Sequence, residues 1–198
     1  IYIMNNDLIS SLPDKTEYKN TTSHKFKRDL VDFCKDKNID NALEIGANHG
    51  HTTNVLSYIS NKVYAIDHLL ENINYIKFVN KDRDNVIPIH GDAYDNLTYK
   101  SINCKFDLVF IDCIHLYDNV IADINRALEY FDKSKGMYLV FDDYGHPHPT
   151  TQQVKKAIDD SMNSGLKFEK YIGEDKGYSC NTSTTLIGNE GIILSYGI

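Results

Sequence analysis

The sequence predicts an α/β protein whose doubly wound sheet is mostly parallel and ends in an antiparallel hairpin. Three observations support this fold class. Short apolar runs alternate five times with stretches of helical periodicity. The last part of the chain instead carries strand-like runs with no long helix between them. An acidic residue lies at or next to the end of each of the first five runs, which is where such sheets bind ligands.

The expected elements follow in order along the chain. Residues 1–20 are polar and irregular, and residues 22–37 have an apolar stripe at helical spacing. The expected parallel strands are 42–46, 63–67, 86–90, 106–112 and 137–142. The expected helices between and after them are 51–60, 70–80, 117–131 and 150–163, of which 117–131 has the clearest periodicity. Residues 167–172, 184–188 and 191–195 complete the set as late strands.

Length and composition favour a single domain. The 198 residues, 41% of them hydrophobic, suffice for one well-buried core. We expect one domain over residues 1–198, with an N-terminal arm and cap helix in 1–38 and the core in 39–198. Because the chain begins with Ile1 rather than Met, other domains of a longer chain could precede it.

Charge and cysteine usage narrow the partners. The net charge of −7, with no strong basic patch, argues against nucleic acid and favours a neutral or cationic partner. The four cysteines have no metal-binding spacing, so we expect reduced thiols in a cytoplasmic protein. No apolar run reaches the length of a membrane span, so we expect no membrane partner. The oligomeric state cannot be inferred from the sequence.

The turn after the first strand indicates a nucleoside site. Gly46 and Gly50 allow a tight turn there, and Asp67 lies 21 residues after Gly46 at the end of the second strand. An acid at about that offset typically accepts hydrogen bonds from ribose hydroxyls. The fingerprint for a dinucleotide is absent, because Asn48 and His51 stand where its second and third glycines would be. A cationic sulfonium with an amino-acid tail suits this acidic pocket better than a diphosphate.

These motifs resemble those of class I S-adenosylmethionine (SAM)-dependent methyltransferases, which have a Rossmann-like fold. Five motifs carry the resemblance over roughly residues 40–195: 43–50, 65–67, 90–93, 106–112 and 136–143. The resemblance implies that Gly46 and Gly50 shape the turn around the methionine moiety and that Glu44 steers it. It implies that Asp67 binds the ribose and that Asp92 with Ala93 holds the adenine edge. The whole cofactor set is then Glu44, Ile45, Gly46, Ala47, Asn48, Gly50, Asp67, His68, Gly91, Asp92, Ala93 and Asp112. The alternative for each acid is that it only caps the following helix.

Two clusters after the fourth and fifth strands point to the methyl acceptor. Asp112 and His115 lie in the first, and Asp142, Asp143 and His146 lie in the second; these five are the candidate catalytic residues. The pattern resembles that of small-molecule and sugar O-methyltransferases, including macrolide and antibiotic-sugar types. Many of these hold a metal on the acids after the fourth and fifth strands. Asp112, Asp142 and Asp143 could bind Mg²⁺ or Mn²⁺, which would lower the pKa of an acceptor hydroxyl.

The sequence leaves two alternatives, a site with a metal and a site without one. Cys113 and Ile114 replace the second and third residues of the usual Asp-Gly-Asp-His motif, and one carboxylate is lost with them. Without a metal, an Asp or His would act as the general base. We expect a small-molecule or glycan hydroxyl as acceptor, with Tyr117, Tyr144 and Tyr178 around the cleft. The composition would suit a large DNA virus or an AT-rich bacterium, so a viral glycan methyltransferase domain is one interpretation. Alternatives are an N-methyltransferase, an NAD-binding oxidoreductase and a non-catalytic SAM-binding module.

Overall fold

The computed structural model describes residues 6–15, 21–145, 149, 151–174 and 188–198. Its strands form a seven-stranded sheet of order β3-β2-β1-β4-β5-β7-β6. Strands β1 to β5 pair in parallel, and β7 runs antiparallel to both of its neighbours, β5 and β6. This topology confirms the predicted fold class, including the antiparallel ending.

The elements begin and end close to the expected positions. The strands are β1 (Asn41–Ile45), β2 (Lys62–Asp67), β3 (Val86–His90), β4 (Leu108–Ile111), β5 (Met137–Phe141), β6 (Lys167–Ile172) and β7 (Gly191–Tyr196). The helices are α1 (Asn6–Ser11), α2 (His24–Cys34), α3 (His51–Ile59), α4 (Leu70–Val79), the 3-10 helix η1 (Asn96–Tyr99), α5 (Tyr117–Glu129) and α6 (Thr151–Asn163).

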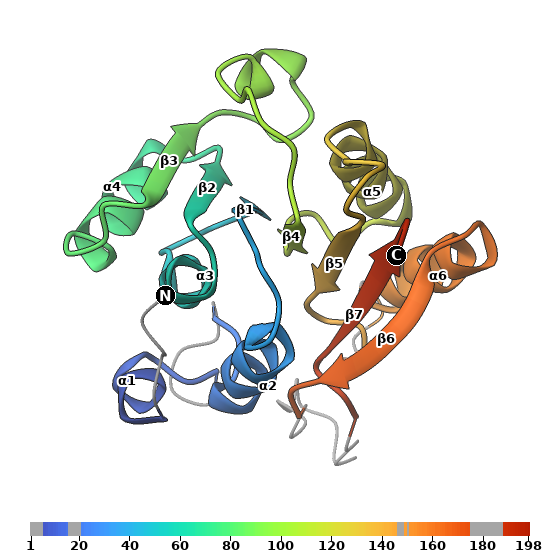
Figure 1. Cartoon of the computed structure of the whole chain (residues 1–198), viewed down its shortest axis with the longest axis horizontal. Coiled ribbons are helices and arrows are strands. Elements are labelled where there is room, and N and C mark those ends of the chain that lie inside the picture. Colours follow the sequence, from blue (N-terminus) through green and yellow to red (C-terminus); the bar gives the residue numbers. More distant parts are fainter. Residues whose placement is uncertain (1–5, 16–20, 146–148, 150, 175–187) are drawn as a thin grey trace.

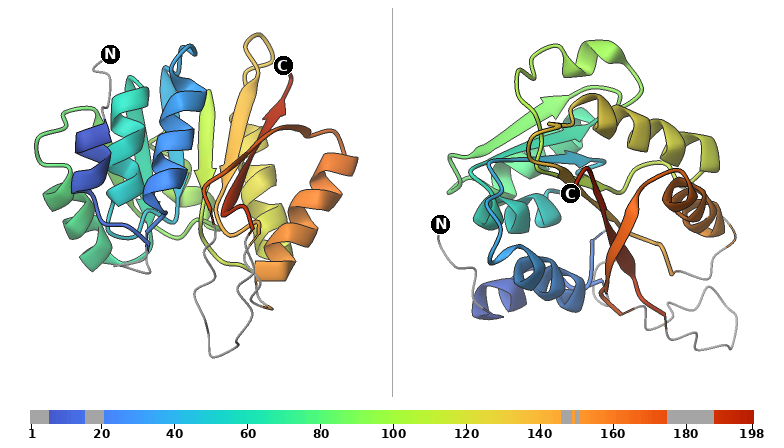
Figure 2. Two further views of the ribbon diagram at one scale, coloured as in Figure 1. Left: turned by 90° about the horizontal axis from the view of Figure 1, so that it is seen from below. Right: turned by 45° about the vertical axis from the view of Figure 1, so that its right-hand side comes forward.

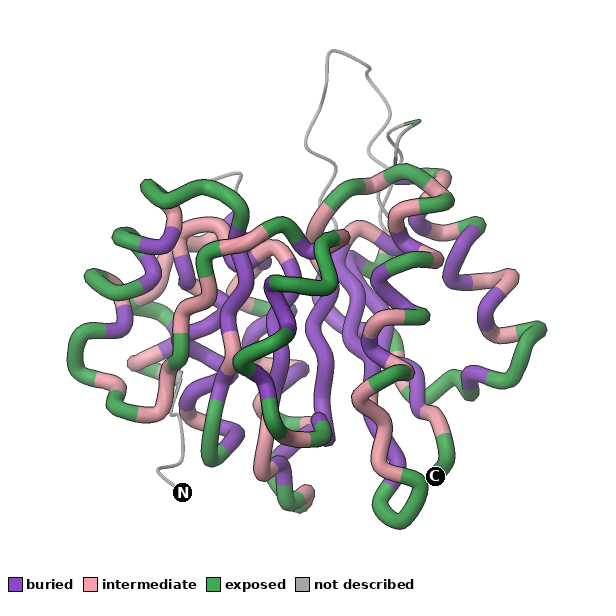
Figure 3. Tube along the Cα trace, turned by 90° about the horizontal axis from the view of Figure 1, so that it is seen from above, coloured by how far each residue is buried: buried purple, intermediate pink, exposed green. Residues whose placement is uncertain are grey.

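Helices cover both faces of the sheet (Figures 1 and 2). Helices α1 to α4 lie on one face and α5 and α6 on the other, and each side has its own apolar core. The central strands are buried on both faces, which is why β4 consists of four buried apolar residues rather than an alternating pattern. Figure 3 shows this buried centre between more exposed helices and loops. Helix α5 packs through the stripe Val120, Ile124 and Ala127, as its periodicity predicts.

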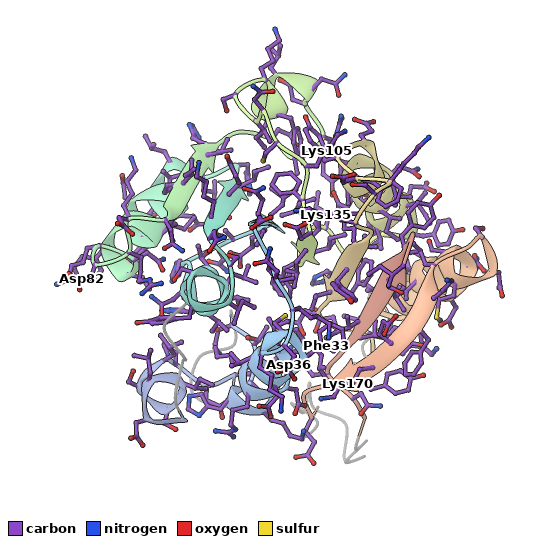
Figure 4. The ribbon with its side chains drawn as sticks, in the orientation of Figure 1. Phe33, Asp36, Asp82, Lys105, Lys135 and Lys170 are labelled. Atoms are coloured by element: carbon purple, nitrogen blue, oxygen red, sulfur yellow. The ribbon has the colours of Figure 1, made fainter. Side chains whose placement is uncertain are left out.

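The N-terminal part is more ordered than expected. Residues 6–11 form α1 where an irregular arm was predicted, and Ile9 of this helix is buried in the core under α2. Helix α2 is shorter than the predicted 22–37. It begins at His24 because the side chain of Ser23 accepts a hydrogen bond from the Phe26 N–H and caps it, and it ends at Cys34. Phe33 of α2, labelled in Figure 4, lies on the side of α2 that faces the sheet. Its ring meets that of Tyr138 of β5 edge-on, with 5.1 Å between the ring centroids.

One predicted strand differs from the structure, and another cannot be compared with it. The fourth is shorter than 106–112, and Phe106 instead forms an isolated bridge to Phe131. The strand expected at 184–188 falls on residues that lie almost wholly outside the described part. Within the described part, no helix is long and apolar enough to cross a bilayer.

The strand order brings the carboxyl ends of β1 to β5 to the same end of the sheet. The order of the strands reverses between β1 and β4, which is where sheets of this kind bind ligands.

Candidate functional site

The register of the sheet gathers the predicted site residues at one edge. Ile45 of β1 pairs with Ile66 of β2 and with Ile111 of β4. The residues that follow these strands, Gly46, Asp67 and Asp112, therefore lie side by side. The Gly91 N–H donates to the Asp67 carbonyl at 3.0 Å, which adds the turn after β3 to the same edge.

Gly46 allows a close approach between two turns. Its φ is +87°, and a Cβ at this position would lie 2.1 Å from the carbonyl oxygen of Asp112. The sequence pattern suggested that glycine makes room for a ligand. In the structure, it makes room for the backbone after β4 and so holds the turns after β1 and β4 together.

Asp67 joins the turns after β1 and β2. Its carboxylate accepts hydrogen bonds from the Asn48 N–H at 2.8 Å, the Leu69 N–H at 2.9 Å and the Asn72 side-chain amide at 3.0 Å. A carboxylate has about four lone-pair positions, so these three bonds leave room for a further donor such as a ribose hydroxyl. Capping and ligand binding are therefore compatible at Asp67.

Glu44 is buried beneath this turn. The hydroxyl of Thr53 donates a hydrogen bond to its carboxylate. Burial raises the pKa of Glu44 to about 8, and the negative charges of Asp112 and Asp67 add to the shift, while Thr53 opposes it. Three carboxyl groups therefore lie close enough to influence one another, and a positively charged ligand would be attracted to the charged pair, Asp67 and Asp112. This chemistry fits the sulfonium and ammonium groups of SAM.

The predicted cofactor residues that follow β2 and β3 differ in exposure. Gly91 packs against Thr98, and Ala93 is buried. Asp92 is exposed and accepts a hydrogen bond from the Tyr94 N–H at 2.9 Å, which shapes the turn after β3. His68 is largely exposed.

On the acceptor side, the structure brings together Asp112, His115 and Asp143. The Nε2 atom of His115 lies 3.3 Å from a carboxylate oxygen of each acid. The hydrogen bond to Asp112 raises the pKa of His115, burial opposes this, and the charges of Asp112 and Asp143 add to the rise. One ligand atom from each of the three residues lies within 4.8 Å of the others, so the described residues include a possible metal-binding group here.

This group differs from the predicted trio Asp112, Asp142 and Asp143 in one member. Asp142 is buried and faces the ammonium of Lys15, whose Nζ lies 3.3 Å from one carboxylate oxygen. The same ammonium lies 3.3 Å from Asp143 and 3.3 Å from Glu190. Burial alone would lower the pKa of Lys15, but Asp142, Glu190 and Asp143 together hold it well above its usual value. Sequence reasoning missed Lys15 because it stands in a polar segment without periodicity.

A second missed residue is Asp123 of α5. It is only 1% exposed, and its Oδ1 atom has no hydrogen-bond partner. Burial raises its pKa to about 7. Asp123 lines a pocket together with Cys113, Asp112, His115 and Asp142, so it lies next to the predicted acceptor residues. Its position among the polar residues of an amphipathic helix gave no sign of burial.

Several predicted acceptor residues contribute less to this cleft. The hydroxyl of Tyr117 donates to Asp160, and that of Tyr144 donates to Asp159, so both point toward α6. His146 and Tyr178 lie outside the described residues. Asp143 has a φ of +58°, an uncommon value that an Asp tolerates better than most residues, and its carboxylate faces both Lys15 and His115.

Comparisons with known proteins agree with this geometry. A family model described as "Methyltransferase domain" matches residues 43–144, just over half of the chain. A putative O-methyltransferase from Klebsiella pneumoniae is 19% identical with a TM-score of 0.62, over 98% of this chain and 86% of that one. A putative rRNA methylase from Clostridium thermocellum is 14% identical with a TM-score of 0.61, over 88% and 98%. No curated protein matches.

Two archaeal fibrillarins also share the fold. The one from Methanococcus jannaschii is 18% identical with a TM-score of 0.56, over 79% of this chain. The one from Aeropyrum pernix, solved with natively bound SAM, is 16% identical with a TM-score of 0.53, over 80%. This chain spans only 65% and 66% of their lengths. At these low identities, the similarity to solved structures shows only the fold. The match to the family model shows to which family the chain belongs. The chain belongs to the methyltransferase-domain family and has the fold of class I SAM-dependent methyltransferases.

Proposed function

We propose that the protein transfers the methyl group of SAM to a hydroxyl of a small-molecule acceptor, with the help of a divalent cation. The observation that carries this proposal is the group of Asp112, His115 and Asp143, of which Asp112 also lies close enough to Glu44 to raise its pKa. Asp112 belongs to both, so the cofactor side and the acceptor side meet at the end of β4.

The residues on the cofactor side would bind and orient SAM, which supplies an electrophilic methyl group. Asp67 would accept a hydrogen bond from a ribose hydroxyl, and the turn of residues 91–93 would border the adenine, as in the family that the sequence resembles. The carboxylates of Asp67 and Asp112 provide the negative potential that favours a sulfonium. Buried Glu44 acts through the turn above it rather than by direct contact.

The acceptor must lose a proton as the new carbon–oxygen bond forms. The Nε2 atom of His115 lies 3.3 Å from a carboxylate oxygen of Asp112 and of Asp143, which favours the protonated imidazole and makes His115 a weaker candidate for the general base than a carboxylate. As a metal ligand, His115 would be neutral, and two carboxylates and an imidazole form a donor set that suits Mn²⁺ better than Mg²⁺. A bound cation would lower the pKa of the acceptor hydroxyl, and a carboxylate oxygen of Asp112 or Asp143 would then take its proton.

The proposed acceptor is a small molecule that carries a hydroxyl group. The acidic residues around the site favour a neutral or cationic molecule over RNA, although some proteins with this fold are rRNA methylases. A glycan remains one candidate, but the tyrosines expected to hold a sugar ring turn toward α6 in two of three cases.

An activity screen with radiolabelled SAM tests the proposal. Catechols, polyols, monosaccharides and bulk rRNA would be offered as acceptors, after treatment with EDTA and again after addition of Mn²⁺ or Mg²⁺. We expect transfer to a hydroxyl compound, loss of transfer with EDTA, and recovery that is better with Mn²⁺. Asp112→Asn should abolish transfer. Asp118→Asn is the matched control, because Asp118 is an exposed acid in the first turn of α5, and this change should leave transfer intact.

The other outcomes would each contradict part of the proposal. Transfer that resists EDTA would shift the task of deprotonation to a general base. Methylation of rRNA alone would contradict the small-molecule acceptor. Methyl incorporation at a nitrogen would contradict O-methylation.

A further inference from the structure

Lys15 lies within the acceptor site although it comes from the N-terminal segment. Its side chain is buried, and its Nζ atom is 3.3 and 3.5 Å from the two carboxylate oxygens of Asp142. Asp143 and Glu190 lie at 3.3 Å. One ammonium thus serves three carboxylates, which would otherwise face one another in a buried space.

Two of these three carboxylates, Asp142 and Asp143, belong to the trio that the sequence predicts as metal ligands. Asp142 and Asp143 follow β5, opposite Asp112 after β4. A lysine ammonium and a divalent cation seek the same carboxylate oxygens, and they repel each other when both are close. Asp143 is the shared residue, because its carboxylate faces Lys15 through Oδ1 and His115 through Oδ2.

We propose that Lys15 competes with the divalent cation for Asp143. Its ammonium pairs with Asp143 when no cation is bound, and it releases Asp143 while staying on Asp142 and Glu190 when a cation binds at Asp112, His115 and Asp143. The inference rests on the proposed function, because it assumes a cation at the carboxylates after β4 and β5. Glu190 gives the displaced ammonium a place to remain. It is 1% exposed and is fixed by the Ser23 N–H at 2.9 Å, so it can keep its ion pair with Lys15.

The competition predicts that loss of the ammonium strengthens cation binding. A cation on Asp143 at a usual metal–oxygen distance of about 2 Å would lie roughly 5 Å from the ammonium in its present position. Even with the dielectric constant of water, the repulsion between charges of +2 and +1 at roughly that distance corresponds to about a tenfold change in affinity.

The test is a Mn²⁺ titration of the purified, metal-free protein, followed by electron paramagnetic resonance of the free ion. We expect Lys15→Met to bind Mn²⁺ at least about tenfold more tightly than the wild type, and Lys15→Arg to stay near the wild type. Lys27→Met is the matched control. Lys27 is also a buried lysine near the N-terminus, but its ammonium donates to Pro13, Thr21 and Thr22 rather than to Asp142 or Asp143. We expect a smaller effect there, below about threefold.

The results separate this inference from the proposed function. Equal or weaker Mn²⁺ binding by Lys15→Met than by the wild type would overturn the competition and leave the metal-assisted reaction standing. Binding by Lys15→Met alone would support the competition and contradict a metal-assisted wild-type reaction. If neither protein bound Mn²⁺, both would be overturned. Should Lys15→Met not fold, Lys15→Gln titrated at the same pH gives the same comparison, and affinity for S-adenosylhomocysteine reports whether the fold is intact.

Discussion

Glu44 should make the stability of this protein depend on pH in the opposite direction to that of an ordinary ion-paired acid. Burial raises its pKa from 4.5 to about 8. Between these two values the folded protein keeps a proton on Glu44 that the unfolded chain loses. The unfolded state therefore binds fewer protons, and the free energy of unfolding falls as the pH rises.

The size of this effect follows from the shift. Each pKa unit corresponds to about 1.4 kcal/mol, so ionisable Glu44 costs roughly 3 kcal/mol at pH 7 and roughly 5 kcal/mol above pH 8, with no cost below about pH 4. Glu44→Gln has nearly the same shape and no charge. It should match the wild type at pH 4 and be more stable by roughly 5 kcal/mol at pH 9, which is about 10 °C or more in Tm for a domain of this size.

Urea unfolding of both proteins between pH 4 and pH 9 measures this difference, since the free energy of unfolding comes from the transition midpoint and slope. Glu71→Gln, at an exposed position of α4, controls for the general effect of removing one charge. The reasoning is refuted if the curves of the wild type and Glu44→Gln run parallel across this range. Parallel curves would mean that Glu44 is ionised in the folded protein at neutral pH.

Three further predictions concern other parts of the fold. Gly46→Ala should lose roughly 2 kcal/mol or more of stability and most of its SAM affinity, since φ is +87° and the new Cβ would meet the Asp112 carbonyl; denaturant unfolding and calorimetry with SAM measure both. Asp123→Asn should be more stable than the wild type by roughly 2–4 kcal/mol at pH 8 and equal to it near pH 4, because burial raises the pKa of Asp123 to about 7; thermal unfolding at the two pH values checks this, and a constant difference would contradict it. Asp107→Ala should cost about 2 kcal/mol, because its carboxylate accepts the Asp40 and Asn41 N–H groups at 2.8 and 2.9 Å at the opposite edge of the sheet, yet SAM binding should stay unchanged.

The sheet and the cofactor side could be predicted from the sequence because both depend on local pattern. A strand buried on both faces reads as a continuous apolar run, as at residues 108–111. Parallel strands then carry whatever follows them to one edge, so the acids at 67 and 112 had to be neighbours once the topology was right. The turn after β1 could be predicted as well, because glycines at 46 and 50 indicate a tight turn, and both have a positive φ in the structure.

The charge balance of the acceptor side could not be predicted in this way. Lys15 reaches Asp142 across 127 positions, and no periodicity or motif marks such a contact. Asp123 is one polar residue among several on α5, and it is buried next to Tyr94 after β3 and Cys113 after β4, neither of which belongs to this helix. Both are decided by tertiary packing. The three predicted acids therefore lie where they were expected in the fold. Asp142, however, pairs with Lys15 instead of joining Asp112 and Asp143 in the possible metal-binding group.

The ion pairs of Lys15 also bear on how the molecule is made. A ribosome releases the chain from its N-terminus, so this lysine is in water long before its carboxylates exist. Asp142 and Asp143 follow much later, and Glu190 later still. The acceptor pocket can thus reach its final electrostatic state only after nearly every strand has been synthesised, and a nascent chain stopped before residue 190 would hold two crowded acids with a single, incompletely anchored counter-ion.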